Sequence, residues 1–133
     1  MLDFVLALHY YNVFLVLTAA TIVGVWGLVL YFTKRAMVKL WRYLLWLTAI
    51  LGALQGVLGL TMVAMGQKPG TGTGLYYLHY VYGGIVALVI PIVAMTYTTG
   101  GKNLRRDLLI LSIAALVLAA AGVRAWMTGP AVP

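Results

Sequence analysis

The stretch from Phe4 to Phe32, FVLALHYYNVFLVLTAATIVGVWGLVLYF, decides the fold, because it contains no Asp, Glu, Lys or Arg. A membrane-spanning helix needs about 20 mainly apolar residues. The run exceeds that length and ends at Lys34 and Arg35, and it lacks the basic start and small-residue cleavage site of a signal peptide. We therefore expect it to remain in the protein as a first transmembrane helix.

Three further apolar runs follow, at about residues 44–65, 76–97 and 108–127, and each is long enough to cross a bilayer. Hydrophobic residues make up 64% of the chain and charged residues 8%, with a mean hydropathy of +1.03. This composition leaves too little polar surface to enclose a water-soluble core. The sequence thus predicts one all-α domain over residues 1–133, an integral membrane four-helix bundle.

The basic residues predict the orientation of this bundle. Seven of the nine Lys and Arg residues lie in the first and third connections, and only Lys68 and Arg124 lie on the other side. The positive-inside rule places those two connections in the cytoplasm, so both termini should face outward from a plasma or inner membrane. The net charge of +7 is accounted for in this way, and we expect no nucleic acid partner. Aromatic residues near the inner boundary, Trp41 and Tyr97 among them, should form an interfacial belt.

The sequence contains a weak internal repeat, in which the first span is similar to the third and the second to the fourth. The triplet Leu-His-Tyr opens the first span at residues 8–10 and the third span at residues 78–80. The second and fourth spans share the pattern Arg-x-Leu-Leu-x-Leu followed by Thr or Ser, at residues 42–48 and 106–112. The chain therefore reads as two parallel helical hairpins related by an axis along the membrane normal.

Few residue types are available for chemistry. The chain has no cysteine, which excludes disulfides, thiolate metal sites and cysteine nucleophiles. Its two acids, Asp3 and Asp107, lie at opposite ends of the spans, and its single serine, Ser112, has no base nearby in the sequence. Hydrolytic and proton-pumping functions therefore lack the residues they need.

His9 and His79 are the only histidines, and they occupy equivalent positions in the two halves of the repeat. Counted from the inner ends of their spans they come to the same depth, near the outer edge of the hydrocarbon. The first and third helices of a bundle are diagonal neighbours, so the two imidazoles can bind one haem iron from both sides. The sequence predicts one bis-histidine haem b; the simpler interpretation of each histidine alone is a residue of the membrane interface.

Residues around this pair suit a porphyrin, although each has a simpler alternative. Gly83 follows His79 by one turn and leaves room for a flat ring, and Arg124 would pair with haem propionates or else extend its charge to the interface. Gln55 near mid-bilayer either bonds across helices or lines a substrate or quinone pocket. Met62 and Met65 are alternative axial ligands or core residues, and Lys68 is a second propionate contact.

The segment Leu54-Gln55-Gly56-Val57-Leu58-Gly59-Leu60-Thr61-Met62-Val63, followed by Leu78-His79, resembles the Gln-x-x-Leu-Gly…Val and His pattern of the haem A synthase family. That family is built from two four-helix halves, and this chain is similar to a single half. The resemblance implies that His9 and His79 are haem ligands on the outer side. Leu6 stands where the catalytic half has a glutamate, and the outer-loop cysteine pair is absent, so the resemblance implies haem b binding rather than haem A synthesis.

Three functions remain in order of preference. The first is one-electron transfer by a membrane haem b protein near the outer face, alone or as a subunit of a respiratory or photosynthetic complex, with quinone as a possible partner. The second is a cofactor-free assembly subunit of a membrane complex, whose small-residue faces pack against other helices. The third is a compact enzyme of the haem A synthase type.

Overall fold

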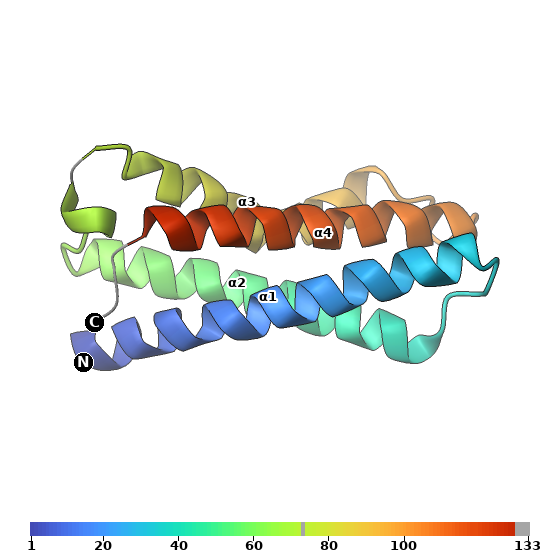
Figure 1. Ribbon diagram of the computed structural model, residues 1–133, viewed down its shortest axis with the longest axis horizontal. Coiled ribbons are helices and arrows are strands. Elements are labelled where there is room, and N and C mark those ends of the chain that lie inside the picture. The colour runs from blue at the N-terminus through green and yellow to red at the C-terminus, as the bar shows by residue number, and fades with distance from the viewer. Residues whose placement is uncertain (73, 130–133) are drawn as a thin grey trace.

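The computed structural model describes residues 1–72 and 74–129, which form four long helices and one short 3-10 turn. The helices are α1 (Leu2–Phe32), α2 (Lys39–Ala64), α3 (Tyr77–Thr96) and α4 (Leu104–Thr128), and the turn is Pro69–Gly72. They run alternately up and down the long axis of the molecule (Figure 1). All four helices are long and apolar enough to cross a membrane, which confirms the all-α, multi-pass prediction.

The helices extend beyond the apolar runs at the ends that carry the basic residues. Helix α2 begins at Lys39 rather than near residue 44, and α4 begins at Leu104 rather than near residue 108. Lys and Arg are good helix formers, so the helical hydrogen bonds continue through the charged turns that precede the spans. The start of α4 is also capped, because the Asn103 side chain accepts a hydrogen bond from the backbone N–H of Arg106.

Each helix packs against two neighbours, and α1 and α3 lie diagonally across the bundle. Helix α1 packs against α2 and α4, and α3 packs against the same two helices. Glycines allow close approach: a Cβ atom at Gly52 of α2 would lie 2.5 Å from the Val86 carbonyl oxygen of α3. The predicted diagonal relationship of the two histidine-bearing helices is therefore confirmed.

The packed apolar core fills the half of the bundle remote from the chain termini, and Trp41 belongs to it. The prediction of Trp41 as an interfacial belt residue is wrong, because its ring is fully buried and its indole Nε1–H donates to the Val23 carbonyl at 2.9 Å. A buried indole with its N–H satisfied gains more from packing than from the interface. Tyr97, by contrast, is 62% exposed. The contiguous core cluster comprises Val16, Ala20, Val23, Leu30, Trp41, Leu45, Ala49, Val86, Ile90, Leu108, Leu111, Ala114, Ala115, Leu118 and Ala121.

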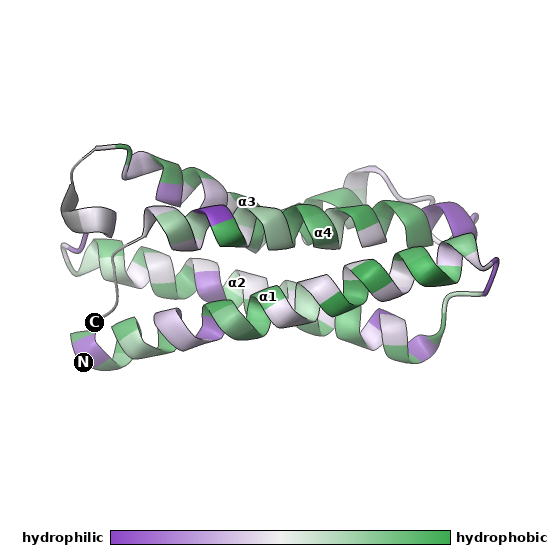
Figure 2. Cartoon of the chain, viewed as in Figure 1, coloured by the Kyte–Doolittle hydropathy of each residue, from purple (hydrophilic) through white to green (hydrophobic). Residues whose placement is uncertain are grey.

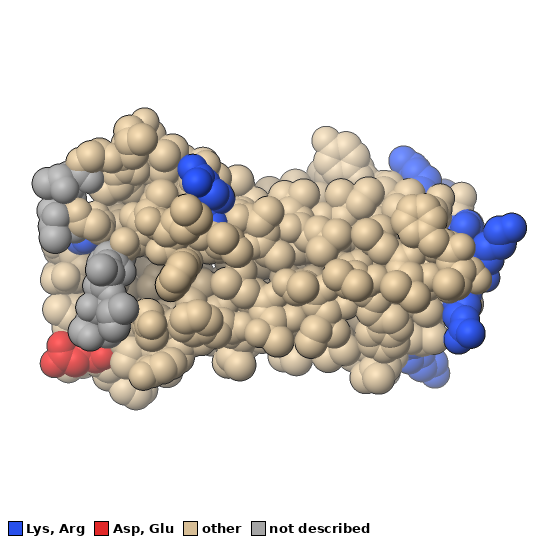
Figure 3. All heavy atoms as spheres, in the orientation of Figure 1, with Lys and Arg blue, Asp and Glu red and all other residues tan. Residues whose placement is uncertain are grey.

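The surface reflects this organisation. Hydrophobic residues cover the helices over most of their length, and hydrophilic residues gather toward the ends (Figure 2). Basic side chains cluster at the end that holds the α1–α2 and α3–α4 connections, and a single acidic side chain, that of Asp3, lies at the opposite end (Figure 3). Asp107 lies at the basic end but is buried, where it accepts hydrogen bonds from Thr99 and Gly101 and so orders the α3–α4 connection.

Candidate functional site

His9 and His79 meet across the bundle. Their ring centroids lie 6.1 Å apart with an angle of 58° between the ring planes, although α1 and α3 are diagonal rather than adjacent helices. Both side chains are half-buried. The two residues singled out by the repeat in the sequence are thus brought together by the fold, and they form the only pair of histidines that the chain contains.

The orientation of the His79 ring is fixed by α4. Its Nδ1 lies 2.7 Å from the Ala125 carbonyl oxygen, and because a carbonyl can only accept, Nδ1 carries the proton. The Nε2 lone pair of His79 is then free to act as an acceptor or a metal ligand. Gly129, just after α4, provides the room, since a Cβ atom there would lie 3.0 Å from the His79 ring.

The His9 ring lies beside α2 and has an unsatisfied nitrogen. A Cβ atom at Gly59 would lie 3.4 Å from Cε1 of His9, so the glycine accommodates the imidazole. The Nδ1 atom of His9 is buried and has no hydrogen-bond partner among the described residues. A buried polar atom without a partner costs about 1–3 kcal/mol, so this nitrogen is a position at which a water molecule or another group outside the described chain would bind.

A polar network holds the segment of α1 that carries His9. Gln55 donates from Nε2 to the His9 carbonyl at 2.9 Å, and the Asn12 amide donates to Gln55 Oε1 at 2.8 Å and to the Leu51 carbonyl at 3.0 Å. Gln55 is therefore a cross-helix hydrogen-bond residue, the simpler of its two predicted roles. The role of Asn12 was not predicted; the only indication in the sequence is that it is a single amide residue within an apolar run, one helical turn after His9.

The core cluster ends before it reaches the histidines. Buried apolar residues on their side, namely Val13, Leu58, Met62 and Ala125, lie outside the contiguous cluster. Gly83, one turn after His79 and on the same helix face, has open space around it, because a Cβ atom there would meet nothing within 4 Å. The surface near the end at which α1 begins is hollowed between helices (Figure 3). The contiguous apolar core therefore does not include the neighbourhood of the pair.

Arg124 lies on α4, beside the residue that bonds His79, and its side chain is exposed. Its guanidinium carbon is 5.6 Å from the centroid of the Tyr82 ring, and it forms no ion pair with the described residues. It directly precedes Ala125, whose carbonyl oxygen accepts a hydrogen bond from Nδ1 of His79. Met62 is buried on α2, Met65 caps the end of that helix, and Lys68 is exposed in the following loop.

The described residues contain no group of three or more His, Asp or Glu side chains arranged to bind a metal ion. Any metal bound here by side chains of the described chain would therefore rest on the two imidazoles. Comparison of the chain with protein-family models, curated proteins and solved structures finds no match. The candidate function therefore rests on the geometry of this site and on the sequence patterns that predicted it.

Proposed function

We propose that this chain is a membrane haem b protein in which His9 and His79 bind one iron from opposite sides, and that it transfers single electrons near the outer face of a cell membrane. The observation that carries the proposal is the 6.1 Å separation of the two ring centroids across the bundle. The two half-buried imidazoles come from diagonal helices and would be the two protein ligands of the iron.

The separation suits two ligands of one metal. Metal–imidazole bonds are about 2.0 Å long, so two rings bound on opposite sides have centroids about 6 Å apart once the ring radius is added. The hydrogen bond from His79 Nδ1 to Ala125 is the usual support for a metal-binding histidine. The unpartnered Nδ1 of His9 is a second indication that a group outside the polypeptide completes the site.

The surrounding residues can accept a flat, partly anionic group. The open space at Gly83 lies on the same face as His79, so a flat ring placed there would displace no side chain at that position. Arg124 carries a positive charge without an ion pair in the described chain, and it is suited to a propionate. A bound haem b supplies reversible one-electron chemistry at the iron. With both histidines as ligands, His9 and His79 would leave no open position for oxygen, which favours electron transfer over oxygen binding.

Orientation and partners follow from the same proposal. By the positive-inside rule the basic clusters favour cytoplasmic α1–α2 and α3–α4 connections, and the histidines would then lie toward the outer face of a plasma or inner membrane. Donors and acceptors would be a quinone in the bilayer or other subunits of a respiratory or photosynthetic complex. The two-hairpin repeat explains why both ligands come from equivalent positions. The proposed kinship with haem A synthases extends to haem binding alone, because Leu6 replaces the catalytic glutamate.

A visible spectrum of the protein purified from haem-replete membranes tests the proposal. We expect a sharp α-band on reduction and a low-spin ferric signal by electron paramagnetic resonance, with one haem per chain. A colourless protein with both histidines intact would exclude the haem function. The assembly-subunit function would then be preferred, because the open small-residue positions Gly83 and Gly84 of α3 would remain available for close packing against another membrane helix.

A further inference from the structure

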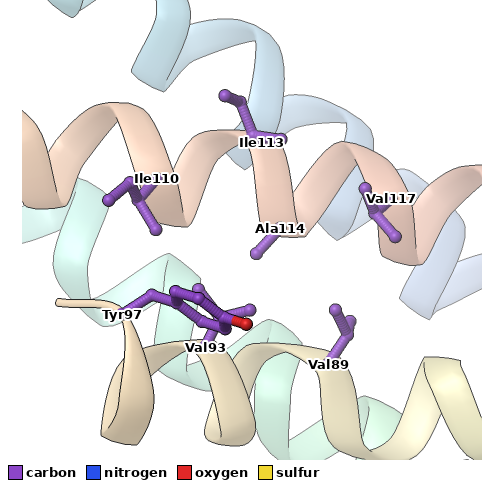
Figure 4. A pocket seen from close by; sticks show the side chains of 7 residues that line it. All are labelled: Val89, Val93, Tyr97, Ile110, Ile113, Ala114 and Val117. Carbon is purple, nitrogen blue, oxygen red and sulfur yellow. The ribbon is translucent and has the colours of Figure 1, made fainter.

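An apolar groove runs along the outside of the bundle between α3 and α4, far from the histidine pair. Its volume is about 240 Å³. Tyr97 bends back along it beside Val93, and the branched side chains of α4 form the facing wall (Figure 4). Ala114 forms a small floor between the two helices. The lining residues are Val89, Val93, Tyr97, Ile110, Ile113, Ala114 and Val117.

The length of the groove fits an acyl chain of one leaflet. From Val89 to Tyr97 the groove follows eight residues of α3, about 12 Å at 1.5 Å per residue. The hydrocarbon of one leaflet is about 15 Å thick, half of the bilayer core. A partner transmembrane helix would need an apolar surface about twice as long. The groove therefore matches a lipid chain better than a protein segment.

A positive charge stands at the interfacial end of the groove. Arg106 precedes Ile110 by one helical turn and so lies on the same face of α4 as the groove wall. It is exposed and forms no ion pair with the described residues, although its charge acts on the buried carboxylate of the neighbouring Asp107. The adjacent Arg105 is engaged elsewhere, with its guanidinium 4.4 Å from the Tyr31 ring centroid. The nearby carboxylate of Asp107 is buried and bonded to the connection through Thr99 and Gly101.

We propose that this groove is a binding site for an anionic phospholipid, with one acyl chain along α3 and α4 and the phosphate held by Arg106. Lys102, exposed in the same connection, adds to the positive potential that selects an anionic headgroup. The acyl chain makes the apolar contacts with the groove, and Arg106 provides selectivity for the headgroup. The site is independent of the haem proposal, because it shares no residue with the histidine pair.

Native mass spectrometry of the detergent-solubilised protein, with phosphatidylglycerol and phosphatidylcholine of identical acyl chains in competition, tests this site. We expect one retained lipid per chain and a preference for phosphatidylglycerol. Arg106→Gln should lower that preference about fivefold, the factor that corresponds to about 1 kcal/mol for one basic residue at the membrane surface. Arg106→Lys should keep most of the preference.

Matched variants separate this site from general attraction to the basic end. Arg42→Gln removes one positive charge from that end on α2, away from the groove, and should leave the preference unchanged. Ile113→Trp fills the groove and should reduce retention of both lipids, whereas Val123→Trp, at a similarly exposed position of α4, should not. Equal effects of Arg106→Gln and Arg42→Gln, or equal retention by the two tryptophan variants, would overturn the proposal.

Discussion

The imidazole of His9 on α1 lies 6.1 Å from that of His79 on α3, centroid to centroid, although the two helices do not form one of the closely packed pairs of the bundle. Long side chains from diagonal helices meet there because the apolar core has already ended. The Ala125 carbonyl fixes one ring, and the Gln55 amide holds the backbone of the other. The two histidines are therefore positioned by hydrogen bonds from α4 and α2, the two helices that lie between α1 and α3.

Substitution of either histidine should abolish the proposed haem site. His9→Ala and His79→Ala each remove one axial ligand, so the iron should become five-coordinate or the haem should be lost. The reduced absorption spectrum and the haem-to-protein ratio measure this. Leu8→Ala and Tyr80→Phe alter exposed neighbours of the two histidines and should keep the low-spin spectrum. An unchanged low-spin spectrum in the double histidine variant would show that other residues bind the iron.

Removal of the Arg124 charge should give a graded effect. Arg124→Leu should retain both histidine ligands and the low-spin spectrum, with weaker haem retention and a lower midpoint potential. The sign follows because a nearby positive charge destabilises the ferric state, which carries one positive charge more than the ferrous state. Redox titration checks the shift. Two control variants should keep a midpoint potential close to that of the parent protein: Arg124→Lys, which retains the charge, and Arg35→Leu, which removes a charge at the opposite end of the bundle. An unchanged midpoint potential in Arg124→Leu would show that the propionates do not lie near Arg124.

Two glycines should respond differently to added side chains. Gly52→Ala forces a Cβ atom to 2.5 Å from the Val86 carbonyl oxygen, so we expect about 1–3 kcal/mol of destabilisation from overpacking. Gly83→Ala meets nothing within 4 Å and should not lower the free energy of unfolding. Denaturant titration in mixed micelles measures both. Gly83→Leu should keep the fold but lower haem content if a porphyrin lies on that face; full occupancy would exclude this placement.

The amide network between α1 and α2 should stabilise the bundle. Asn12→Leu and Gln55→Leu each break the bond of 2.8 Å between the two side chains, and a double-mutant cycle should give a coupling of about 0.6 kcal/mol, within the range up to about 1.7 for membrane proteins. Thr61→Val removes only a bond within α2 and is the control. Strictly additive effects of the two leucine substitutions would show that the observed bond contributes no stability.

The orientation can be tested with introduced cysteines, because the chain has none of its own. Gln67→Cys in the α2–α3 connection should react with a membrane-impermeant thiol reagent in intact cells. Ala36→Cys in the α1–α2 connection should react only after the membrane is opened. Both positions are exposed, so access depends on the side of the membrane. The reverse pattern would place the histidines on the cytoplasmic side.

The number of helices and the common level of the two histidines follow from the residue pattern alone. Each of the four spans is an apolar run bounded by charges, prolines or glycines, and a bilayer of fixed thickness requires such a run to form a helix, since lipid cannot satisfy a free backbone amide. A position along a helix then converts directly into depth, at 1.5 Å per residue. His9 and His79 could therefore be placed at one level from their distance to the ends of their spans.

The direction in which each side chain faces depends on how the four helices pack together. The helices are apolar around most of their circumference, so their sequences carry little signal for rotation about the axis, and that rotation is set by packing at glycines and by hydrogen bonds between helices. For this reason Trp41 was misplaced in an interfacial belt, whereas it lies in the core bonded to Val23. The same packing turned His9 and His79 toward each other and brought the Ala125 carbonyl to His79, a partner that has no side-chain signal in the sequence.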